Sequence, residues 1–395
     1  MGISRTWKAE PAPSPRPREG QTSAETFFRD LLAQAGIKLN GSQPWDLQVT
    51  DPRAYERLLR HGSIGFGEAF MDGSLNCERV DLLAERVYRT ALLERIEVKT
   101  ALLHALKVWL NPFGSRSRSF EIGEYHYDTG NDLFQVMLDP YMIYSCGYWH
   151  RAQTLDAAQR DKLELICRKL QLQPGMRVLD IGCGWGGLAR YAAERYGVTV
   201  VGISVSQEQI ELGRRLSAGL PVELRYVDYR DVDETFDRVV SVGMFEHVGR
   251  RHYPAFFAAC DRCLKPSGIM LLHTVGYLKE EAINPWYDKY VMPGVEFPTV
   301  ANIIDSAGRN LLLEDFHTWE GGHYDKTLMA WFERFDGGWG ELKQNYGEVF
   351  YRMWKLYLQG CAGAFRADRM RVWQLVFSKG GIPGGYAYGH HYPLD

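Results

Sequence analysis

The segment MIYSCGYW at residues 142–149 places the thiol of Cys146 among the aromatic rings of Tyr144, Tyr148 and Trp149. A thiol in such a setting can act as a nucleophile, as a metal ligand or as a filler of the core. Aromatic residues make up 13% of the chain, which suits an apolar or cationic ligand but also a bulky core. The segment alone leaves all three roles of the thiol open.

The glycine-rich segment VLDIGCGWGG at residues 178–187 indicates a nucleotide-like cofactor. Three of its glycines allow a tight turn and a close approach of the backbone to a ligand, namely Gly182, Gly184 and Gly186. The match to G-x-G-x-x-G is a weak signal by itself. A nicotinamide cofactor is disfavoured, because Asp180 precedes the first glycine and the next strand runs into Ser204 without an acid for the ribose hydroxyls.

The bulk composition excludes several kinds of partner and site. A net charge of −3 gives no general attraction to nucleic acid. The seven cysteines are odd in number and irregularly spaced, and the N-terminus is polar, so we expect a reduced cytoplasmic setting. The lone CxxC motif, Cys260 to Cys263, lacks a second pair of ligands, so no metal site is expected. No apolar run reaches membrane-spanning length.

Strands and helices alternate from about residue 160, and they are the elements that position these segments. The apolar runs predict strands at 176–181, 198–202, 222–227, 236–241 and 267–274, with helices such as 188–197 and 206–216 between them. A further strand-like run at 311–317, a helix at about 325–335 and the run 372–380 follow. This alternation predicts an open, doubly wound α/β sheet.

The first third of the chain has a different pattern. Residues 1–22 are rich in proline and polar groups, which predicts a disordered tail. Helical spacing of apolar residues then predicts helices starting near 23 and covering 51–62, 80–96 and 99–110. We therefore expect a small, mainly helical domain at 23–120 and a catalytic domain at 121–395.

A series of segments in order gives the chain a strong family resemblance. The glycine loop is similar to the first motif of S-adenosylmethionine (SAM)-dependent methyltransferases. From about residue 38 to the end, the chain resembles the cyclopropane-fatty-acyl-phospholipid synthases and the related mycolic acid cyclopropane synthases. The segments that carry this resemblance are 67–73, 126–134, 138–149, 172–187, 228–231, 240–249, 271–276, 324–335 and 361–367. It implies a class I SAM-dependent methyltransferase fold, Rossmann-like, behind a helical N-terminal domain.

The resemblance implies a reaction in which the sulfonium methyl of SAM is added across a cis double bond of a phospholipid acyl chain. A proton then leaves the former methyl group, and the three-membered ring closes. Because an alkene is a poor nucleophile, the sulfonium has to be held in line with the π bond. The carbocation needs a dry site, and each aromatic face beside it contributes about 0.5–2 kcal/mol.

The resemblance also implies a role for the thiol. Cys146 corresponds to a position that helps to hold a bicarbonate ion, and this ion is the base. Glu246, His273 and Tyr324 correspond to further contacts of the ion, and Val275 corresponds to a main-chain contact. Since a carboxylate repels an anion, the bicarbonate hydroxyl is expected to point at Glu246. The nucleophile role is weaker, because the alkene itself attacks and no covalent enzyme intermediate is required.

Two more residues join the active-site candidates through the resemblance. Tyr127, in the sequence HYD, corresponds to an active-site aromatic residue. Cys361, in CAGAFRA, is singled out in some family members. No chemical role for its thiol follows from the residues around it, and we expect a structural cysteine.

The cofactor is expected at the loops that follow the first strands, at the carboxyl edge of the sheet. Gln209 is expected to replace the usual acid at the ribose, and the residues after the third strand are expected near the adenine. The full set of predicted cofactor-binding residues is Tyr144, Ser145, Asp180, Gly182, Gly184, Gly186, Ser204, Val205, Gln209, Asp228 and Tyr229.

A substrate buried in a bilayer leaflet requires contact with lipid. Residues 99–119 hold basic and apolar side chains and no acid, which favours an interfacial helix drawn to anionic headgroups. A core-packed helix followed by a basic linker explains the pattern equally well. The apolar stretch 284–297 is a candidate for part of the acyl channel or a lid. We expect a homodimer that is cytoplasmic and peripheral at the inner membrane surface.

Other functions share many of these features. A lipid methyltransferase that makes a methyl-branched or methylene chain would use the same cofactor site and the same carbocation. A lipid-binding protein with a vestigial cofactor fold belongs to another class, and the complete set of predicted bicarbonate ligands speaks against it. An oxidoreductase ranks third.

Overall fold

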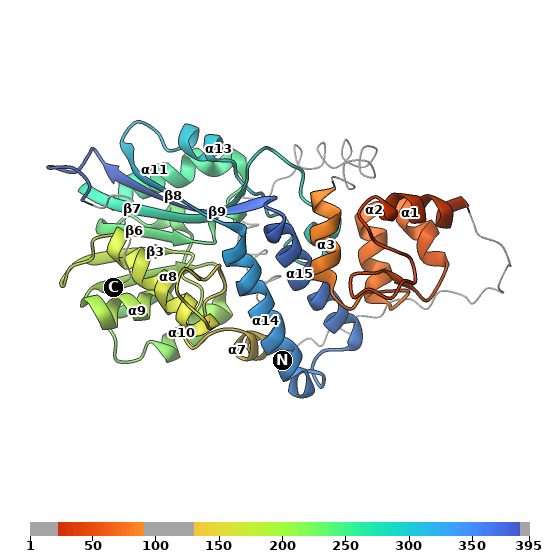
Figure 1. Cartoon of the computed structure of the whole chain (residues 1–395). Helices are drawn as coiled ribbons and strands as arrows, with labels where there is room; N and C mark the ends of the chain where they lie inside the picture. Colours follow the sequence, from red (N-terminus) through yellow and green to blue (C-terminus); the bar gives the residue numbers. More distant parts are fainter. Residues whose placement is uncertain (1–22, 91–129, 388–395) are drawn as a thin grey trace.

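The computed structural model describes residues 23–90 and 130–387. A seven-stranded sheet forms its larger part, in the order β5-β4-β3-β6-β7-β9-β8 (Figure 1). The strands from β5 to β7 are parallel, and β9 runs antiparallel to both of its neighbours. The strands are β3 (Arg177–Ile181), β4 (Thr199–Ser204), β5 (Val222–Tyr226), β6 (Phe236–Val242), β7 (Leu264–Tyr277), β8 (Leu311–Trp319) and β9 (Met370–Lys379).

Helices cover both faces of the sheet, so the central strands are apolar on both sides. Along β3, Val178 belongs to a cluster with α8 (Leu155–Lys169) and α9 (Gly187–Tyr196). Its neighbour Leu179 belongs to another cluster, with α11 (Tyr253–Cys263) and α13 (Val300–Ser306). The remaining helix of this parallel part is α10 (Gln207–Leu216), which follows β4. The predicted doubly wound sheet is therefore confirmed.

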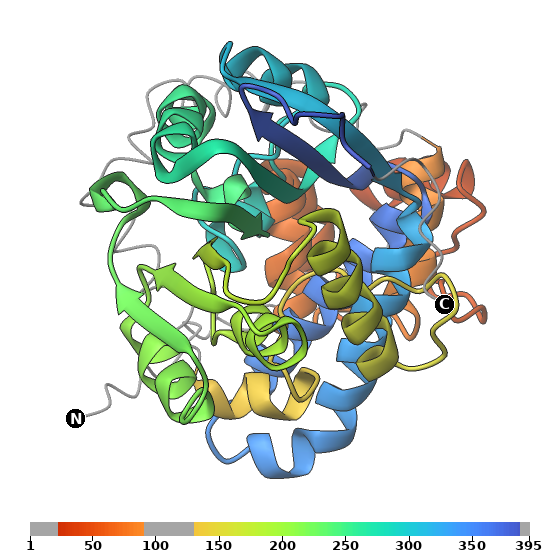
Figure 2. The ribbon, with the colours of Figure 1, turned by 90° about the vertical axis from the view of Figure 1, so that its left-hand side faces the viewer.

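The N-terminal helices lie at the far end of the molecule from the outer strands (Figure 1) and behind the sheet in the view of Figure 2. They are α1 (Ser23–Ala33), α2 (Arg53–Met71) and α3 (Val80–Arg89), with a two-stranded sheet of β1 (Gln48–Val49) and β2 (Leu75–Asn76). Helix α2 runs beyond the predicted end at 62, across a kink at Gly62 with φ 53° and ψ −127°. A positive φ favours glycine at this position.

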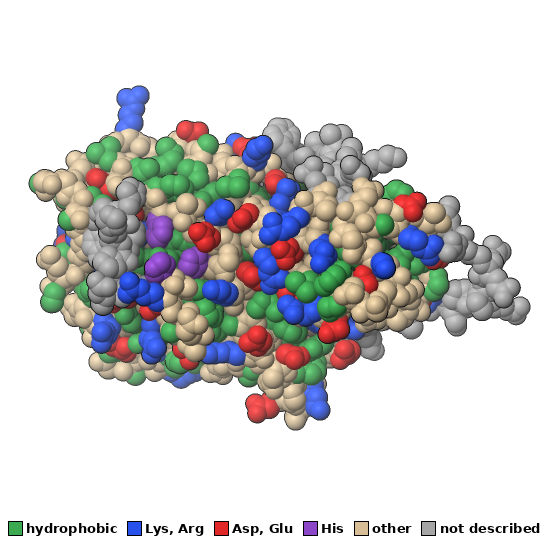
Figure 3. Space-filling view, in the orientation of Figure 1, with side chains coloured by type: hydrophobic (Ala, Val, Ile, Leu, Met, Phe, Trp, Pro, Cys, Tyr) green, Lys and Arg blue, Asp and Glu red, His purple; other side chains and the backbone are tan. Residues whose placement is uncertain are grey.

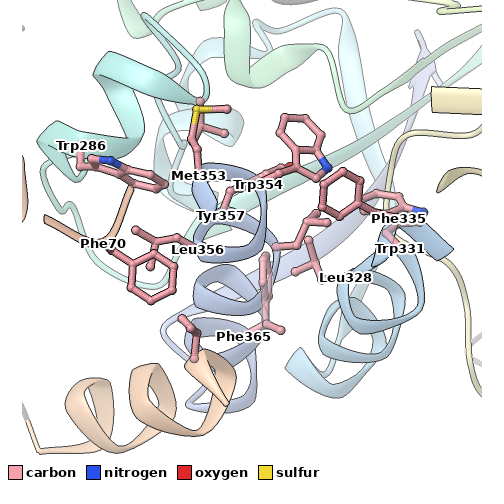
Figure 4. Packing of buried hydrophobic residues seen from close by; sticks show 14 of the residues in the cluster. Phe70, Trp286, Leu328, Trp331, Phe335, Met353, Trp354, Leu356, Tyr357 and Phe365 are labelled. Atoms are coloured by element: carbon pink, nitrogen blue, oxygen red, sulfur yellow. The ribbon is translucent and has the colours of Figure 1, made fainter. Parts of the chain in front are cut away.

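Two long helices connect the N-terminal helices to the sheet. They are α14 (Gly321–Leu342) and α15 (Glu348–Arg366). Figure 4 shows Phe70 of α2 and Trp286 of α12 (Pro285–Tyr290) on one side of α15, and Trp331 and Phe335 of α14 on the other. All four side chains belong to one apolar cluster that also contains residues of α1 and α3. The N-terminal helices thus share their core with helices from the end of the chain.

A glycine allows a close contact between α15 and α3. A Cβ added at Gly363 of α15 would lie 2.4 Å from the carbonyl oxygen of Asp81 in α3. The buried backbone N–H of Val80 donates to Oε1 of Gln359 at 2.9 Å, and Arg366 contacts the Asp81 carboxylate at 2.9 Å. The contact therefore combines close backbone packing with paired polar groups.

Several predictions fall on residues that the structure does not describe. The disordered tail at 1–22, the interfacial helix at 99–119 and the domain boundary at 120 all lie outside the described residues. The 80–96 helix is described only as far as Arg89. On the face shown in Figure 3, acidic and basic side chains are interspersed.

Candidate active site

Loops at the carboxyl ends of the parallel strands surround a cavity of about 160 Å³. We call it the cofactor cavity. Its lining includes ten of the eleven predicted cofactor-binding residues: Tyr144, Ser145, Asp180, Gly182, Gly184, Ser204, Val205, Gln209, Asp228 and Tyr229. Gly186 is the exception, because a Cβ there would lie 2.9 Å from Leu224, on the side of the loop that packs against β5. The structure thus brings together segments that are far apart in the sequence.

The glycine loop needs backbone conformations that other residues rarely adopt. Gly182 and Gly184 have φ of 81° and 55°. A Cβ at Gly182 would lie 2.5 Å from the Met244 side chain, whereas one at Gly184 would have no atom within 4 Å. Gly184 therefore faces open space at the cavity and leaves room for a ligand close to the backbone.

Polar side chains in the cofactor cavity are held by their neighbours. The Ser204 hydroxyl donates to Oε1 of Gln209 at 3.1 Å, so two of the predicted cofactor-binding residues are linked. Both carboxylate oxygens of Asp228 accept from the Arg230 guanidinium at 2.7 Å. This ion pair fixes the carboxylate at the end of β5.

A buried lysine is a site residue that the sequence did not reveal. Lys162 of α8 lines the cofactor cavity, and its ammonium donates to the Ser145 hydroxyl at 2.7 Å. Burial lowers the pKa of Lys162 and raises the pKa of Asp180, whose Oδ2 has no hydrogen-bond partner among the described residues. In the sequence, a single lysine in a helix looks like a solvated surface residue, so its place in the cavity becomes visible only in the folded structure.

A second, mainly apolar cavity of about 310 Å³ adjoins the first. We call it the apolar cavity. The two cavities share Tyr144, Ser145, Gly243 and His247 in their walls. One part of the apolar cavity is lined by N-terminal residues such as Phe28, Leu31, Tyr55, Leu83 and Val87. The predicted channel segment 284–297 contributes Trp286, Tyr287, Met292, Val295 and Phe297.

The predicted bicarbonate ligands gather at the apolar cavity. Cys146, Glu246, His273, Val275 and Tyr324 all line it, and we call this group the anion site. Cys361 lines the same cavity, and burial raises the pKa of its thiol to about 12. Tyr127 lies outside the described residues.

Glu246 has one satisfied and one unsatisfied carboxylate oxygen. Its Oε1 accepts from the backbone N–H of Val275 at 2.7 Å, and its Oε2 has no hydrogen-bond partner among the described residues. Burial raises the pKa of this carboxyl to about 7. Since a buried unpaired oxygen is costly, the free Oε2 suits a ligand that donates a proton to it.

Three other members of the anion site, Cys146, His273 and Tyr324, carry a proton that can be donated. The Cys146 thiol donates to the Gly147 carbonyl at 3.3 Å in this structure. Burial raises the pKa of the Cys146 thiol well above its usual range, so the sulfur keeps its proton. Burial likewise raises the pKa of the Tyr324 phenol. Burial lowers the pKa of His273 well below its usual value, so the imidazole is neutral and has one N–H. A protonated thiol disfavours the nucleophile role of Cys146.

Aromatic rings enclose the site. The Tyr144 and Tyr357 hydroxyls lie 2.8 Å apart, and the Tyr324 ring lies 4.5 Å from that of Phe365. Tyr287 packs against Tyr357 at 5.9 Å between ring centroids. Such walls exclude water and present aromatic faces to a positive charge.

The described residues carry neither a metal-ligand cluster nor a membrane-spanning helix. Within residues 23–90 and 130–387, His, Cys, Asp and Glu side chains nowhere gather in a group that could hold a metal ion. None of the described helices combines the length and the apolar character that crossing a membrane requires.

Comparisons with known proteins identify the family. Residues 114–375 match the model of the mycolic acid cyclopropane synthetase family. The chain is 48% identical over 359 residues to the cyclopropane-fatty-acyl-phospholipid synthase of Escherichia coli K12. The aligned region covers 89% of this chain and 92% of the synthase. It is 35% identical to the tuberculostearic acid methyltransferase UfaA1 of Mycobacterium tuberculosis, over 91% of this chain and 92% of that one.

A solved structure agrees with these relatives. The mycolic acid cyclopropane synthase CmaA1, complexed with S-adenosylhomocysteine (SAH) and CTAB, superposes on this chain with a TM-score of 0.62 at 33% sequence identity. The match covers 66% of this chain and 98% of CmaA1. The sheet order and this likeness confirm the predicted SAM-dependent methyltransferase fold. The chain belongs to the mycolic acid cyclopropane synthetase family.

Proposed function

We propose that the protein transfers the methyl group of SAM to a cis double bond of a phospholipid acyl chain and closes a cyclopropane ring. The observation that carries this proposal is the junction of the two cavities. The cofactor cavity, whose lining includes the polar side chains of Lys162, Asp180 and Asp228, meets an apolar cavity suited to an acyl chain at Tyr144 and Ser145. The 48% identity to a cyclopropane-fatty-acyl-phospholipid synthase supports the same activity.

The chain's residues fit the cofactor. SAM supplies an electrophilic methyl group on a sulfonium. Gly184 leaves open space beside the backbone for it, and Ser204 with Gln209 offers polar atoms at the end of β4. Lys162 fixes the hydroxyl of Ser145, which lies in the wall of both cavities. These groups orient the methyl donor toward the apolar cavity, where the alkene would lie.

The anion site accounts for loss of the proton. In our proposal a bicarbonate ion lies between Cys146, Glu246, His273 and Tyr324. The thiol, the phenol and the imidazole N–H would donate to its oxygens, and its hydroxyl would donate to Oε2 of Glu246. An ion held there would supply a base for the proton that leaves the former methyl group as the ring closes, and the products would be the cyclopropane lipid, SAH and carbonic acid.

The walls of the apolar cavity serve the cationic intermediate. Water in this space would quench the carbocation, and the lining is mainly apolar. The rings of Tyr144, Tyr287 and Tyr324 border the same cavity and offer π faces to the charge. Tyr127 and Cys361 remain candidates: the first for an aromatic wall, the second for a structural thiol.

The lipid location of the substrate motivates the remaining proposals. We propose that the protein is a cytoplasmic homodimer that binds the inner membrane surface through the basic and apolar segment 99–119. Replacing Lys107, Arg116 and Arg118 by Glu should weaken binding to anionic vesicles and reduce turnover on them, with a smaller loss on detergent-dispersed lipid. Sedimentation at several protein concentrations tests the dimer. Vesicle binding that ignores both salt and these substitutions would leave the segment a structural helix and linker.

The activity is tested with purified protein, SAM and vesicles of a monounsaturated phospholipid. Mass spectrometry should show the gain of one methylene unit per modified chain, and proton NMR should show cyclopropane rather than alkene protons. A methyl-branched or methylene product would instead place the chain with the UfaA1-like methyltransferases. Binding of SAM without any lipid product would favour a lipid-binding protein with a vestigial cofactor fold.

A further inference from the structure

A row of polar side chains crosses three strands behind the anion site. In the sheet register, His273 of β7 is the partner of Gln374 in β9, and Gln374 is the partner of His317 in β8. Partner residues on adjacent strands place their side chains on the same face. Gln374 is fully buried, and His273 is 2% exposed. A buried amide therefore lies between two imidazoles, one of which belongs to the anion site.

The hydrogen bonds commit Gln374 to His273. Nε2 of Gln374 lies 3.2 Å from Nδ1 of His273. The other histidine is engaged elsewhere, because the Lys169 ammonium lies 3.1 Å from Nδ1 of His317 and 3.2 Å from the Asp315 carboxylate. Oε1 of Gln374 is buried and has no hydrogen-bond partner among the described residues. The amide thus makes a single side-chain contact, and that contact is to the anion site.

The direction of this contact decides where His273 carries its proton. If the amide N–H donates to Nδ1, the proton of the neutral ring lies on Nε2. If the amide were reversed, Oε1 would accept from Nδ1–H, and Nε2 would be a bare acceptor. Burial and the nearby ammonium groups of Lys162 and Lys169 lower the pKa of His273, so the ring has one proton rather than two.

The surroundings favour the first arrangement. His273 shares the apolar cavity with the Glu246 carboxyl, whose Oε2 has no partner among the described residues. A carboxylate or a bound anion in that space attracts an N–H and repels a lone pair. The Trp319 ring, edge-on to His273 at 5.0 Å and 82°, limits rotation of the imidazole. Ring orientation and tautomer are therefore both set from outside the cavity.

We propose that Gln374 is a positioning residue that holds His273 as the Nε2–H tautomer, so that the imidazole donates a hydrogen bond to the anion of the active site. This inference rests on the proposed function, because the anion is part of that proposal. Gln374 itself contacts neither the anion nor the lipid. It acts through the proton on His273, in the way that the hydrogen-bond partner of the second ring nitrogen fixes the tautomer of a metal-bound histidine.

The substitution Gln374→Glu reverses the preference with almost no change in shape. A carboxylate at this position accepts from Nδ1–H and turns Nε2 into an acceptor, so the anion loses a donor. The bicarbonate concentration that gives half of the maximal rate should rise about tenfold to a hundredfold. Gln374→Met keeps the length and removes the hydrogen bond, and its effect should be intermediate.

A matched control lies in the same strand. Ser378 of β9 is fully buried, lies on the same face four residues on, and donates a hydrogen bond to Glu314 of β8. Ser378→Ala removes a buried hydrogen bond of β9 without touching a histidine. It should lower the melting temperature and leave the bicarbonate dependence unchanged. A purely structural Gln374 would behave in the same way as this control.

A spectroscopic measurement separates the inference from the proposed function. Nitrogen NMR of histidine-labelled protein, with the His273 signals assigned by subtraction of a His273→Gln spectrum, should show a bare Nδ1 and a protonated Nε2. In Gln374→Glu the proton should appear on Nδ1. A wild-type His273 protonated on Nδ1 overturns the inference, even if the variants fail to fold. A wild-type rate that ignores bicarbonate refutes the anion instead, while the NMR result still decides the role of Gln374.

Discussion

Replacement of Glu246 by Gln should stabilise the protein at alkaline pH while it slows the reaction. The carboxyl is buried; its Oε1 accepts from the N–H of Val275 at 2.7 Å, and its Oε2 has no hydrogen-bond partner within residues 23–90 and 130–387. The amide oxygen of Gln can keep that contact. The substitution therefore removes mainly a buried charge, and the effect should depend on whether the charge is present.

The magnitude follows from the two pKa values of Glu246. Burial raises the pKa of this carboxyl from 4.5 to about 7. A raised pKa in the folded state means that stability is fully present below pH 4.5 and is lost as the pH rises through about 7. The difference of about 2.5 units corresponds to about 3 kcal/mol at 1.36 kcal/mol per unit. Ionised Glu246 thus destabilises the folded protein by about this amount above neutral pH.

The assay compares wild type and Glu246→Gln by denaturant unfolding without lipid or cofactor. The variant's advantage in unfolding free energy should be larger by about 3 kcal/mol at about pH 8.5 than at about pH 4.5. Asp180 and Lys162 also titrate with altered pKa values, but they are common to both proteins and cancel in the difference. Glu320→Gln replaces an exposed carboxylate before α14 and serves as the control for removal of a carboxylate outside the cavity.

The rate should move in the opposite direction. Loss of an acceptor for the bicarbonate hydroxyl removes a charge-assisted hydrogen bond of about 1.5–3 kcal/mol, or about tenfold to a hundredfold in rate. A stability difference that is the same at both pH values would refute the buried-charge argument. A variant as active as the wild type would refute the role of Glu246 in the anion site.

Three further predictions concern the cofactor loop, the helix contact and the thiol. Gly184→Asp puts a side chain where φ is 55° and the cavity opens, so calorimetry should show loss of SAM binding with the fold intact; unchanged affinity contradicts the assignment of the loop. Gly363→Ala should lower the unfolding free energy by about 1–3 kcal/mol, because the added methyl group would overpack against α3. Gly360→Ala in the same helix has open space at its Cβ and should raise the unfolding free energy by up to about 1 kcal/mol. Equal effects of the two substitutions would refute the close contact. Cys146→Ser should lose less activity than Glu246→Gln, because Ser keeps a donor; an inactive Ser variant with no response to bicarbonate would restore the nucleophile role.

Hydrophobic period and glycine placement made most of the sheet predictable. The apolar runs at 176–181 and 236–241 agree with β3 and β6 to within a residue, because strands buried on both faces are continuously apolar. β7 spans Leu264–Tyr277 and is longer than the predicted strand at 267–274. The prediction missed both ends because Lys265 and Tyr277 lie outside the apolar run. The antiparallel direction of β9 was not predicted, because its residues look like those of any buried strand.

The missed site residues share a physical cause. Lys162 and Gln374 are polar residues whose importance depends on burial, and burial is set by partners far away in sequence. Lys162 lies on helix α8, which the sequence analysis does not predict. Gln374 lies in β9, and its partner residues in the neighbouring strands β7 and β8 are far from it in the sequence. Glu246 and His273 were found only because a resemblance pointed to them. Residues such as Lys162 and Gln374 can be assigned to the site only once the fold shows that they are buried beside it.

The N-terminal helices contribute a wall of the proposed substrate site. The family model begins at residue 114, after α1, α2 and α3, and CmaA1 covers 66% of this chain. Yet Phe28, Leu31 and Leu83 from these helices line the same apolar cavity as Glu246 and His273. Without them that cavity would lose one apolar side, and a carbocation formed in it would meet water. We therefore expect the helices to contribute to the reaction as well as to the core, since the close contact at Gly363 holds α3 against α15, which itself lines the cavity.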